Sequence, residues 1–417
     1  MVEIYLLIKN HPPPPLKTII RAVEIIGDKT YITVALPLDK LSAINQNNFT
    51  ITLSGEPITA DNIKTFGFWP YFSAIGGQSY IFSWLYKHTD NKDIKTLWKI
   101  TALLSAIGLV SLTFLYYRSN IFPKGFSIAF FVSIFFSTAF TLYARNPYWI
   151  PFLWFLPIIF ALLYVKAKSI KQQRITLLLL YFAFLLKCMT SSYEFLSPIV
   201  LMMAAPASYL FFVSNNYKDK IANGKKFLMI FFITFLAFVT TIFIHAYMVG
   251  EMILHQNIIE GFKYLYNERF RVRVINLSGS DDIFQLHSYS QPSHEVSYLS
   301  VLKTYIFDRW YYNNIIWGIS GKWFPWLIFL TGLMIISNDF IPLTQRKRKT
   351  YSALFLSFVL VAPSWYILVK PSAYNQQHIY YMAWYFGFIA ALFYIIASHL
   401  NIYRKIIFSY GKMKLDR

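Results

Sequence analysis

Residues 177–203 read LLLLYFAFLLKCMTSSYEFLSPIVLMM, two apolar runs that meet at a short polar turn. Both runs have the composition of membrane-spanning helices, yet Lys187 and Glu194 lie where they meet. An ionisable side chain near the hydrocarbon of a bilayer is costly, so it usually faces a cavity, pairs with another group or acts on a substrate. The stretch therefore predicts two membrane helices with a site of interest between them.

The rest of the chain has the same character. Of its 417 residues, 56% are hydrophobic and only 14% are charged, which would leave a soluble protein with one continuous apolar surface. Apolar runs of about twenty residues recur, each long enough for the roughly 30 Å hydrocarbon core of a bilayer. The sequence therefore predicts an all-α polytopic membrane protein. The single cysteine, Cys188, excludes an internal disulfide.

Nine apolar segments are predicted to cross the membrane. They are residues 97–117, 122–143, 147–165, 175–189, 195–214, 227–249, 323–338, 351–369 and 378–399. The fourth and the seventh are short for a full span, which is tolerated where a helix lines a protein cavity instead of lipid.

The placement of basic residues predicts the orientation of these spans. Nineteen lie in alternate connections and in the tail, all on one side, whereas the short connections on the other side hold only three. The nineteen are Arg118, Lys124, Lys166, Lys168, Lys171, Arg174, Lys218, Lys220, Lys225, Lys226, Arg346, Lys347, Arg348, Lys349, Arg404, Lys405, Lys412, Lys414 and Arg417. Basic loops stay in the cytoplasm, so the C-terminus is predicted to be cytoplasmic in the plasma (inner) membrane. This placement also argues against nucleic acid as a partner, despite the formal charge of +20.

The remaining segments give the domain organisation. Residues 1–66 are predicted to be an external segment; within them, residues 17–60 alternate apolar and polar residues between turn formers, which predicts short strands. An external N-terminus leads to the hypothesis of one further helix before it, ten in all, since residues 1–15 fit neither a signal peptide nor a span. Residues 67–96 predict an interfacial amphipathic segment, in which Gly76 and Gly77 allow a tight turn or close backbone approach. Residues 97–417 form the bundle, with an external loop at 250–322.

With the basic loops inside, several ionisable residues gather on the outer face. The connection after the second span holds Arg145, and the one after the fourth holds Lys187, Tyr193 and Glu194. The connection between the eighth and ninth spans holds Lys370 and His378. Glu194 is a candidate general base or metal ligand, and Arg145, Lys187 and Lys370 are candidates for binding phosphate oxygens. Tyr193 and His378 are further candidates for binding phosphate or substrate. The alternative is that the lysines reach to lipid headgroups and that Glu194 pairs with Lys187.

The loop at 250–322 offers further candidates. Ile253, Ile258, Phe262 and Leu265 predict one apolar helical face of the kind that lies on a membrane surface. Two polar groups follow, a set of alternating arginines suited to a diphosphate and a set of metal-binding residue types, and each also fits a solvated loop. These residues are Arg269, Arg271 and Arg273 for the first set, and Asp281, Asp282, His287, His294 and Glu295 for the second.

Three stretches resemble segments of the C-type (GT-C) membrane glycosyltransferases and of bacterial proteins similar to them. WPYFSAIGGQSYIFSWLYK resembles their YSQFGLQG segment, and LLKCMTSSYEFLSP resembles a KxxTGYEY turn, matched at Lys187, Tyr193 and Glu194. KPSAYNQQHIYYMAW resembles a KxHSxxHxHxxxxxW turn, matched at Lys370, His378 and Trp384.

The resemblance implies transfer of a sugar from a polyprenyl phosphate or diphosphate donor to a glycan, lipid or protein on the outer face of the membrane. An acid in the first external loop is the usual base or metal ligand of that class, which makes Asp61 a second catalytic candidate beside Glu194. Whether a divalent cation takes part is left open. Two alternatives remain: a surface-polysaccharide polymerase or ligase, and a transporter or lipid flippase. Transporters usually show related halves, and no internal repeat is visible here.

Overall fold

The computed structural model describes residues 2–7, 19–26, 29–36, 52–53, 56–57, 75–78, 81, 94–146, 149–191, 193–253, 257–269, 297–308, 310, 313–337, 344–368 and 380–415. They belong to two compact units, Met1–Tyr71 and Phe72–Arg417. Within the described residues, the first unit consists of strands, and the second consists of helices and one short hairpin.

The first unit contains an antiparallel sheet of three strands in the order β1, β3, β2. Ile26 pairs with Lys29, so only two residues connect β2 to β3, a length typical of tight hairpins. A second antiparallel pair joins β4 and β5. The bounds are β1 (Val2–Leu7), β2 (Ile19–Ile26), β3 (Lys29–Leu36), β4 (Thr52–Leu53) and β5 (Glu56–Pro57). Strands β2 to β5 therefore lie within residues 17–60, where the alternating pattern predicts strands, whereas β1 lies before that stretch.

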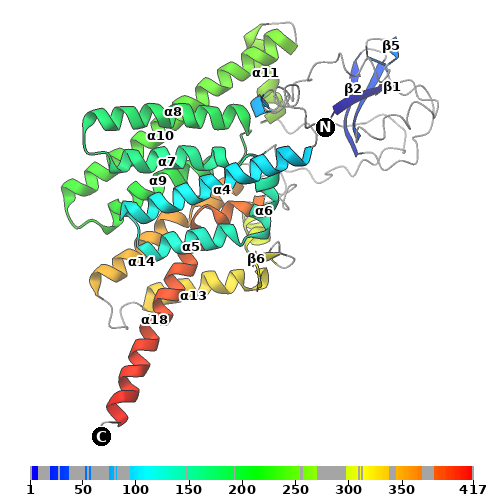
Figure 1. Ribbon diagram of the computed structural model, residues 1–417. Helices are drawn as coiled ribbons and strands as arrows, with labels where there is room; N and C mark the ends of the chain where they lie inside the picture. The colour runs from blue at the N-terminus through cyan, green and yellow to red at the C-terminus, as the bar shows by residue number, and fades with distance from the viewer. Residues whose placement is uncertain are drawn as a thin grey trace. The chain divides into compact units, whose positions relative to one another are not determined.

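The second unit is a helical bundle. Its elements are α4 (Ile94–Ser119), α5 (Lys124–Phe135), α6 (Thr138–Arg145), α7 (Phe152–Lys166), α8 (Ile170–Thr190), α9 (Leu196–Val213), α10 (Tyr217–Tyr247), the π-helix η2 (Met248–Ile253), α11 (Ile258–Arg269), α12 (Tyr298–Lys303), the π-helix η3 (Thr304–Asp308), β6 (Asn314–Ile316), β7 (Ile319–Ser320), the 3₁₀ helix η5 (Gly321–Trp323), α13 (Phe324–Ile336), α14 (Gln345–Phe358), α15 (Val361–Leu368), the 3₁₀ helix η7 (Tyr381–Tyr385) and α18 (Phe388–Leu415). Short connections join α7 to α8 and α9 to α10, so these neighbours pack antiparallel, as Figure 1 shows.

Five helical segments in the described part of the chain are long and apolar enough to cross a membrane. They are Thr96–Ser119, Ile170–Thr190, Leu196–Val213, Tyr217–Glu251 and Gln345–Leu368, and the bent pair α5 and α6 would make a sixth. Two further apolar helices, Phe152–Lys166 and Gly321–Ile336, are shorter. A helix or helix pair lies at each of the nine predicted intervals, but nine crossings remain a prediction.

The exposed surface of the bundle is apolar. On α10, Leu228, Phe232 and Phe235 are each about 60% exposed or more, although each is a large hydrophobic side chain. Contiguous apolar surface of this kind is unstable in water and stable against lipid tails. The chain is therefore an integral membrane protein.

The predicted second span is broken. One continuous helix is expected over residues 122–143, but α5 ends at Phe135 and α6 leaves at an angle of 68°. Ser137 caps α6 by accepting a hydrogen bond from the Phe140 amide at 3.1 Å. The Phe136 carbonyl, which leaves the helical ladder at the break, accepts a hydrogen bond from the Trp317 amide at 2.9 Å. A distant hairpin therefore satisfies the backbone carbonyl that the break frees, as the absence of water within a bilayer requires.

Replacing Ser137 by alanine tests the importance of this break. The variant Ser137→Ala loses the cap of α6, and we expect a stability loss of about 1 kcal/mol. The chain's eleven tryptophans allow thermal unfolding in detergent to be followed by intrinsic fluorescence. Ser127 on α5 is equally buried, but its hydroxyl lacks a hydrogen-bond partner in the described structure, so Ser127→Ala is the matched control and should be neutral or stabilising. Equal changes in melting temperature for the two variants would contradict this role of Ser137.

The late loop packs on the bundle through α11. Leu265 on α11 is buried against Ala246 and Val249, and Ile258 and Phe262 pack beside them. The prediction that this apolar face lies on the membrane surface is therefore wrong for the described residues: the face is covered by the end of α10. Two glycines allow the approach. A Cβ at Gly261 would lie 1.9 Å from the Ala246 carbonyl oxygen, and one at Gly250 would lie 2.3 Å from the Asn257 oxygen.

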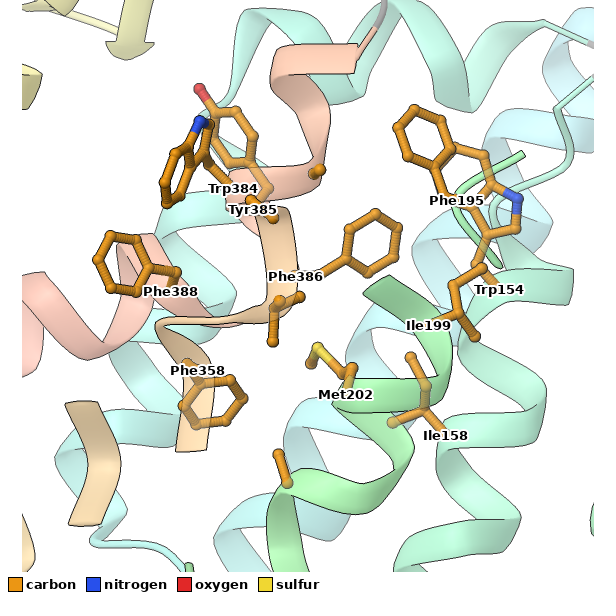
Figure 2. Close-up of a cluster of buried hydrophobic side chains, with 14 of the residues drawn as sticks. Trp154, Ile158, Phe195, Ile199, Met202, Phe358, Trp384, Tyr385, Phe386 and Phe388 are labelled. Atoms are coloured by element: carbon orange, nitrogen blue, oxygen red, sulfur yellow. The ribbon is translucent and has the colours of Figure 1, made fainter. Parts of the chain in front are cut away.

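The core is dominated by aromatic rings where α7, α9, α14 and the segment from η7 into α18 meet. Figure 2 shows Trp154 and Phe195 beside each other, with Phe386 between them and Met202. Gly387 takes a φ of +92°, and a Cβ there would meet the Phe358 ring at 2.4 Å. Glycine is thus required where the chain turns from η7 into α18.

Candidate functional site

The turn between α8 and α9 is the centre of the candidate site. Lys187, in the last turn of α8, is fully buried, and its Nζ donates a hydrogen bond of 2.7 Å to the backbone oxygen of Glu194. The Ser191 hydroxyl donates to the Lys187 carbonyl at 3.1 Å. Phe195 then takes a left-handed backbone conformation with φ of +55°. The turn is therefore closed by a buried lysine on one side and a strained residue on the other.

The strain at Phe195 is held by its surroundings. A non-glycine residue in this conformation costs roughly 1–3 kcal/mol and persists only where packing enforces it. Phe195 is completely buried, and six aromatic rings surround it with centroid distances between 5.3 and 6.3 Å. The six rings belong to Tyr143, Trp149, Trp154, Trp365, Tyr380 and Phe386. The aromatic cage thereby fixes the direction in which Glu194 leaves the turn.

A second strained residue lies in the neighbouring connection. Ile150, between α6 and α7, has φ of +38°, which is rare for a β-branched side chain. Its neighbour Trp149 packs against Phe195 at 5.9 Å. Two strained turns are thus in contact at the same end of the bundle. Such outliers cluster at functional sites, where they hold groups in a required geometry.

Glu194 is half-buried and lies near Tyr143. Its Oε2 atom is buried, and the Tyr143 hydroxyl interacts electrostatically with its carboxylate. The same Tyr143 hydroxyl also interacts with those of Tyr305, Tyr380 and Tyr381. These tyrosines come from α6, η3, the residue before η7, and η7 itself. Tyr143 is therefore the phenol near this carboxylate, and the other three tyrosines lie near Tyr143.

Hydrogen bonds hold these segments to one another. Tyr305 and Tyr366 stack in parallel with centroids 3.9 Å apart, and the Tyr366 hydroxyl donates to the Tyr380 carbonyl at 3.1 Å. The Trp384 indole donates to the Tyr305 carbonyl at 3.2 Å. Tyr305 and Tyr380 are therefore packed into the core.

A further polar contact joins the turn to α10. The Tyr193 hydroxyl lies 2.9 Å from Nδ1 of His245, a residue that is only 2% exposed. The chain before α4 also reaches this region. Gly76 has φ of +67°, and a Cβ on Gly77 would lie 3.0 Å from the Met189 carbonyl oxygen near the end of α8. The close approach predicted for these glycines is present. Ile75 and Gln78 are buried in the protein, whereas Ile81 is exposed, so the interfacial position of residues 67–96 stays a prediction.

The structure brings some of the predicted site residues together. Lys187, Tyr193 and Glu194 form one cluster, as their spacing implies. Arg145 ends α6, two residues beyond Tyr143, but its side chain is exposed. Several predicted candidates lie outside the described residues or have undescribed side chains; these are Asp61, Lys370, His378, Arg269, Arg271, Arg273, Asp281, Asp282, His287, His294 and Glu295. Among the residues that are described, no three His, Cys, Asp or Glu side chains gather in a way that could hold a metal ion.

The headgroup alternative for Lys187 is wrong. A lysine that reaches to the lipid headgroups exposes its ammonium group, whereas Lys187 has no exposed surface and its Nζ bonds a backbone oxygen. The residue therefore stabilises the turn from inside the protein.

No protein family matches this chain, and neither a curated protein nor a solved structure shows significant similarity to it. The site must therefore be interpreted from its own residues.

Sequence reasoning missed His245 and the tyrosines near Glu194. His245 is visible as an imidazole within the apolar run IFIHAYMV, a signal comparable to that of Lys187. The tyrosines carried no such signal, because tyrosine is abundant throughout the chain and common at membrane interfaces.

Proposed function

We propose that the protein is a membrane enzyme that transfers a sugar from a polyprenyl-phosphate-linked donor to a glycan, lipid or protein acceptor. The observation that supports this function best is the setting of Glu194. A half-buried carboxylate, held in a strained turn and near the Tyr143 phenol, is suited to orient a sugar hydroxyl and accept its proton. The resemblance of residues 185–198 to a glycosyltransferase turn points to the same chemistry.

The reaction would be an inverting displacement. Glu194 accepts the proton of the acceptor hydroxyl while the acceptor oxygen bonds to the anomeric carbon, and the bond from that carbon to the phosphate oxygen breaks. The lipid phosphate leaves with the bonding electron pair. Because phosphate is a good leaving group, positioning and charge stabilisation provide most of the rate acceleration. Aromatic side chains with a few placed polar groups are typical of such binding sites.

The cationic residues have separate roles in this proposal. Lys187 acts on the turn and not on the substrate, since its Nζ is occupied by the Glu194 carbonyl and is fully buried. Arg145 is exposed beside the site and is the described candidate for contact with the departing phosphate. Lys370, His378 and Asp61 remain sequence-based candidates for the same site. The Glu194 end of the bundle faces outward in this proposal because the basic connections lie at the opposite ends of the helices.

The proposal is tested with defined lipid donors. Purified protein in detergent is incubated with farnesyl phosphates carrying glucose, mannose, galactose or N-acetylglucosamine, and with envelope glycans and lipids from the expression host as acceptors. We expect one donor to be consumed, with farnesyl phosphate released and the anomeric configuration of the new bond inverted by NMR. Retention of configuration would exclude the inverting displacement. If none of the donors is consumed at any acceptor concentration, the transferase proposal fails for this class of donors.

A further inference from the structure

His245 and Tyr193 form a contact that the proposed chemistry does not yet use. The Tyr193 hydroxyl and His245 Nδ1 are 2.9 Å apart, and the two rings face each other obliquely, with centroids 5.7 Å apart. The two residues come from different elements, the α8–α9 turn and α10. A buried polar group in a membrane helix is unfavourable unless it is hydrogen-bonded, so this contact fixes the position of the histidine ring.

Tyr193 is the direct neighbour of Glu194. Its ring also packs edge-on against Phe238 of α10, with centroids 5.9 Å apart. Lys187 holds the Glu194 carbonyl, and the Tyr193 side chain is held by α10, so the turn is fixed at two successive residues. Displacing the Tyr193 side chain would change the backbone that carries the Glu194 carboxylate.

The end of α10 is itself fixed in place. Directly after His245, Ala246 packs against α11, and the backbone continues into the π-helix η2 two residues later. Single turns of π-helix are rare and occur frequently near functional sites. The position of His245 is therefore determined by the docking of α11 as well as by Tyr193.

We infer that His245 is a positioning residue for the reaction, acting through the Nδ1 contact with Tyr193 to set the orientation of the Glu194 carboxylate. This inference rests on the proposed function for the role of Glu194. It adds a residue from a third helix to the site and gives the Tyr193 hydroxyl a structural partner in place of a substrate. The contact does not require His245 to touch substrate.

Two isosteric replacements at His245 test the inference. The amide atoms of asparagine are attached to Cγ, as Nδ1 is, whereas those of glutamine lie one bond further out, near the position of Nε2. His245→Asn should therefore keep the contact with Tyr193, and His245→Gln should lose it. Tyr193→Phe removes the hydroxyl from the other side. For His245→Gln and Tyr193→Phe we expect kcat to fall by about tenfold to a hundredfold with KM within about twofold, as for a group that acts on the transition state. His245→Asn should stay within about threefold of the unchanged protein by the same reasoning.

A matched control separates positioning from general stability. Tyr181 on α8 donates a hydrogen bond of 2.8 Å to Thr240 on α10. Like the Tyr193–His245 contact, it joins a tyrosine hydroxyl to a polar side chain of α10, but Tyr181 is thirteen residues from Glu194 in the sequence. Tyr181→Phe should leave kcat unchanged. If Tyr181→Phe lowers kcat as much as Tyr193→Phe does, or if His245→Gln equals His245→Asn, the inference is overturned.

A second readout does not depend on sugar transfer. A hydrophobic carbodiimide, dicyclohexylcarbodiimide, modifies carboxyl groups in apolar surroundings, and peptide mass spectrometry gives its rate of reaction at Glu194. We expect that rate to change severalfold in His245→Gln and Tyr193→Phe and to stay unchanged in His245→Asn and Tyr181→Phe. If labelling changes in this way but no donor is consumed, the proposed transfer reaction is refuted and the positioning of Glu194 by His245 is supported. Equal labelling in all four variants, together with active transfer, would refute the role of His245 alone.

Discussion

The variant Glu194→Gln is expected to lose sugar transfer almost completely. Glutamine has nearly the same size as glutamate, so the strained turn, the Lys187 contact with the backbone and the aromatic cage should persist. It cannot accept a proton, and a general base typically contributes about a hundredfold to ten-thousandfold to the rate. Initial rates of farnesyl phosphate release, measured at saturating donor, give this loss directly.

The control for this variant is Glu260→Gln. Glu260 lies on the exposed part of α11 and pairs with Lys263 at 2.6 Å, and an exposed pair of this kind contributes only about 0–1 kcal/mol to stability. The Glu260→Gln variant should therefore retain full transfer activity. A Glu194→Gln protein with unchanged rates would remove the catalytic role of Glu194 and leave Asp61 as the sequence-based candidate for the base.

The largest loss of stability is expected for Gly261→Ala. The new methyl group would lie 1.9 Å from the Ala246 carbonyl oxygen and 2.8 Å from the Gly250 amide nitrogen, and both of these atoms belong to the backbone. Neither can move away as a flexible side chain could, so α11 must shift off α10. Overpacking of this kind costs roughly 1–3 kcal/mol and sometimes more. Thermal unfolding in detergent should therefore begin at a temperature several degrees lower.

A second glycine provides the comparison. Gly332 lies within α13, and no other group lies within 4 Å of the position of its missing Cβ. Gly332→Ala should therefore stabilise the helix by about 0.5–1 kcal/mol, since alanine is the better helix former. Identical melting temperatures for the two variants would show that α11 does not pack on α10 as described. Ala246 directly follows His245, so a shift of α11 at Ala246 should also displace His245. Gly261→Ala should therefore change carbodiimide labelling of Glu194, whereas Gly332→Ala should not.

Several features of the fold follow from the sequence alone. The recurrence of long apolar runs with few charges determines a helical membrane protein, because only helices satisfy their own backbone hydrogen bonds within one such segment in lipid. The predicted intervals coincide with helices for the same reason. The pair Gly76 and Gly77 also indicated correctly a close backbone approach, since no other residue permits one so readily. The short spacing from Lys187 to Glu194 ensured that these two residues share one turn.

Other features were decided only by the tertiary structure. Apolar side chains of a membrane helix pack almost equally well against lipid tails and against a neighbouring helix. Hydropathy therefore does not show which face of a helix is covered by protein. For this reason the sequence did not reveal that α11 covers the end of α10, or that the second predicted span breaks where Trp317 can bond the freed carbonyl of Phe136.

The same limit applies to the candidate site. Its sequence-local part, Lys187, Tyr193 and Glu194, was predicted, whereas His245 and the phenols of Tyr143 and Tyr305 join it only through packing. The sequence by itself determined where polar groups interrupt the membrane helices, because an ionisable residue among apolar ones is visible without a structure. Which of these groups meet was decided by the contacts between α6, α8, α10, η3 and η7, and those contacts depend on the shapes of side chains that the apolar pattern does not distinguish.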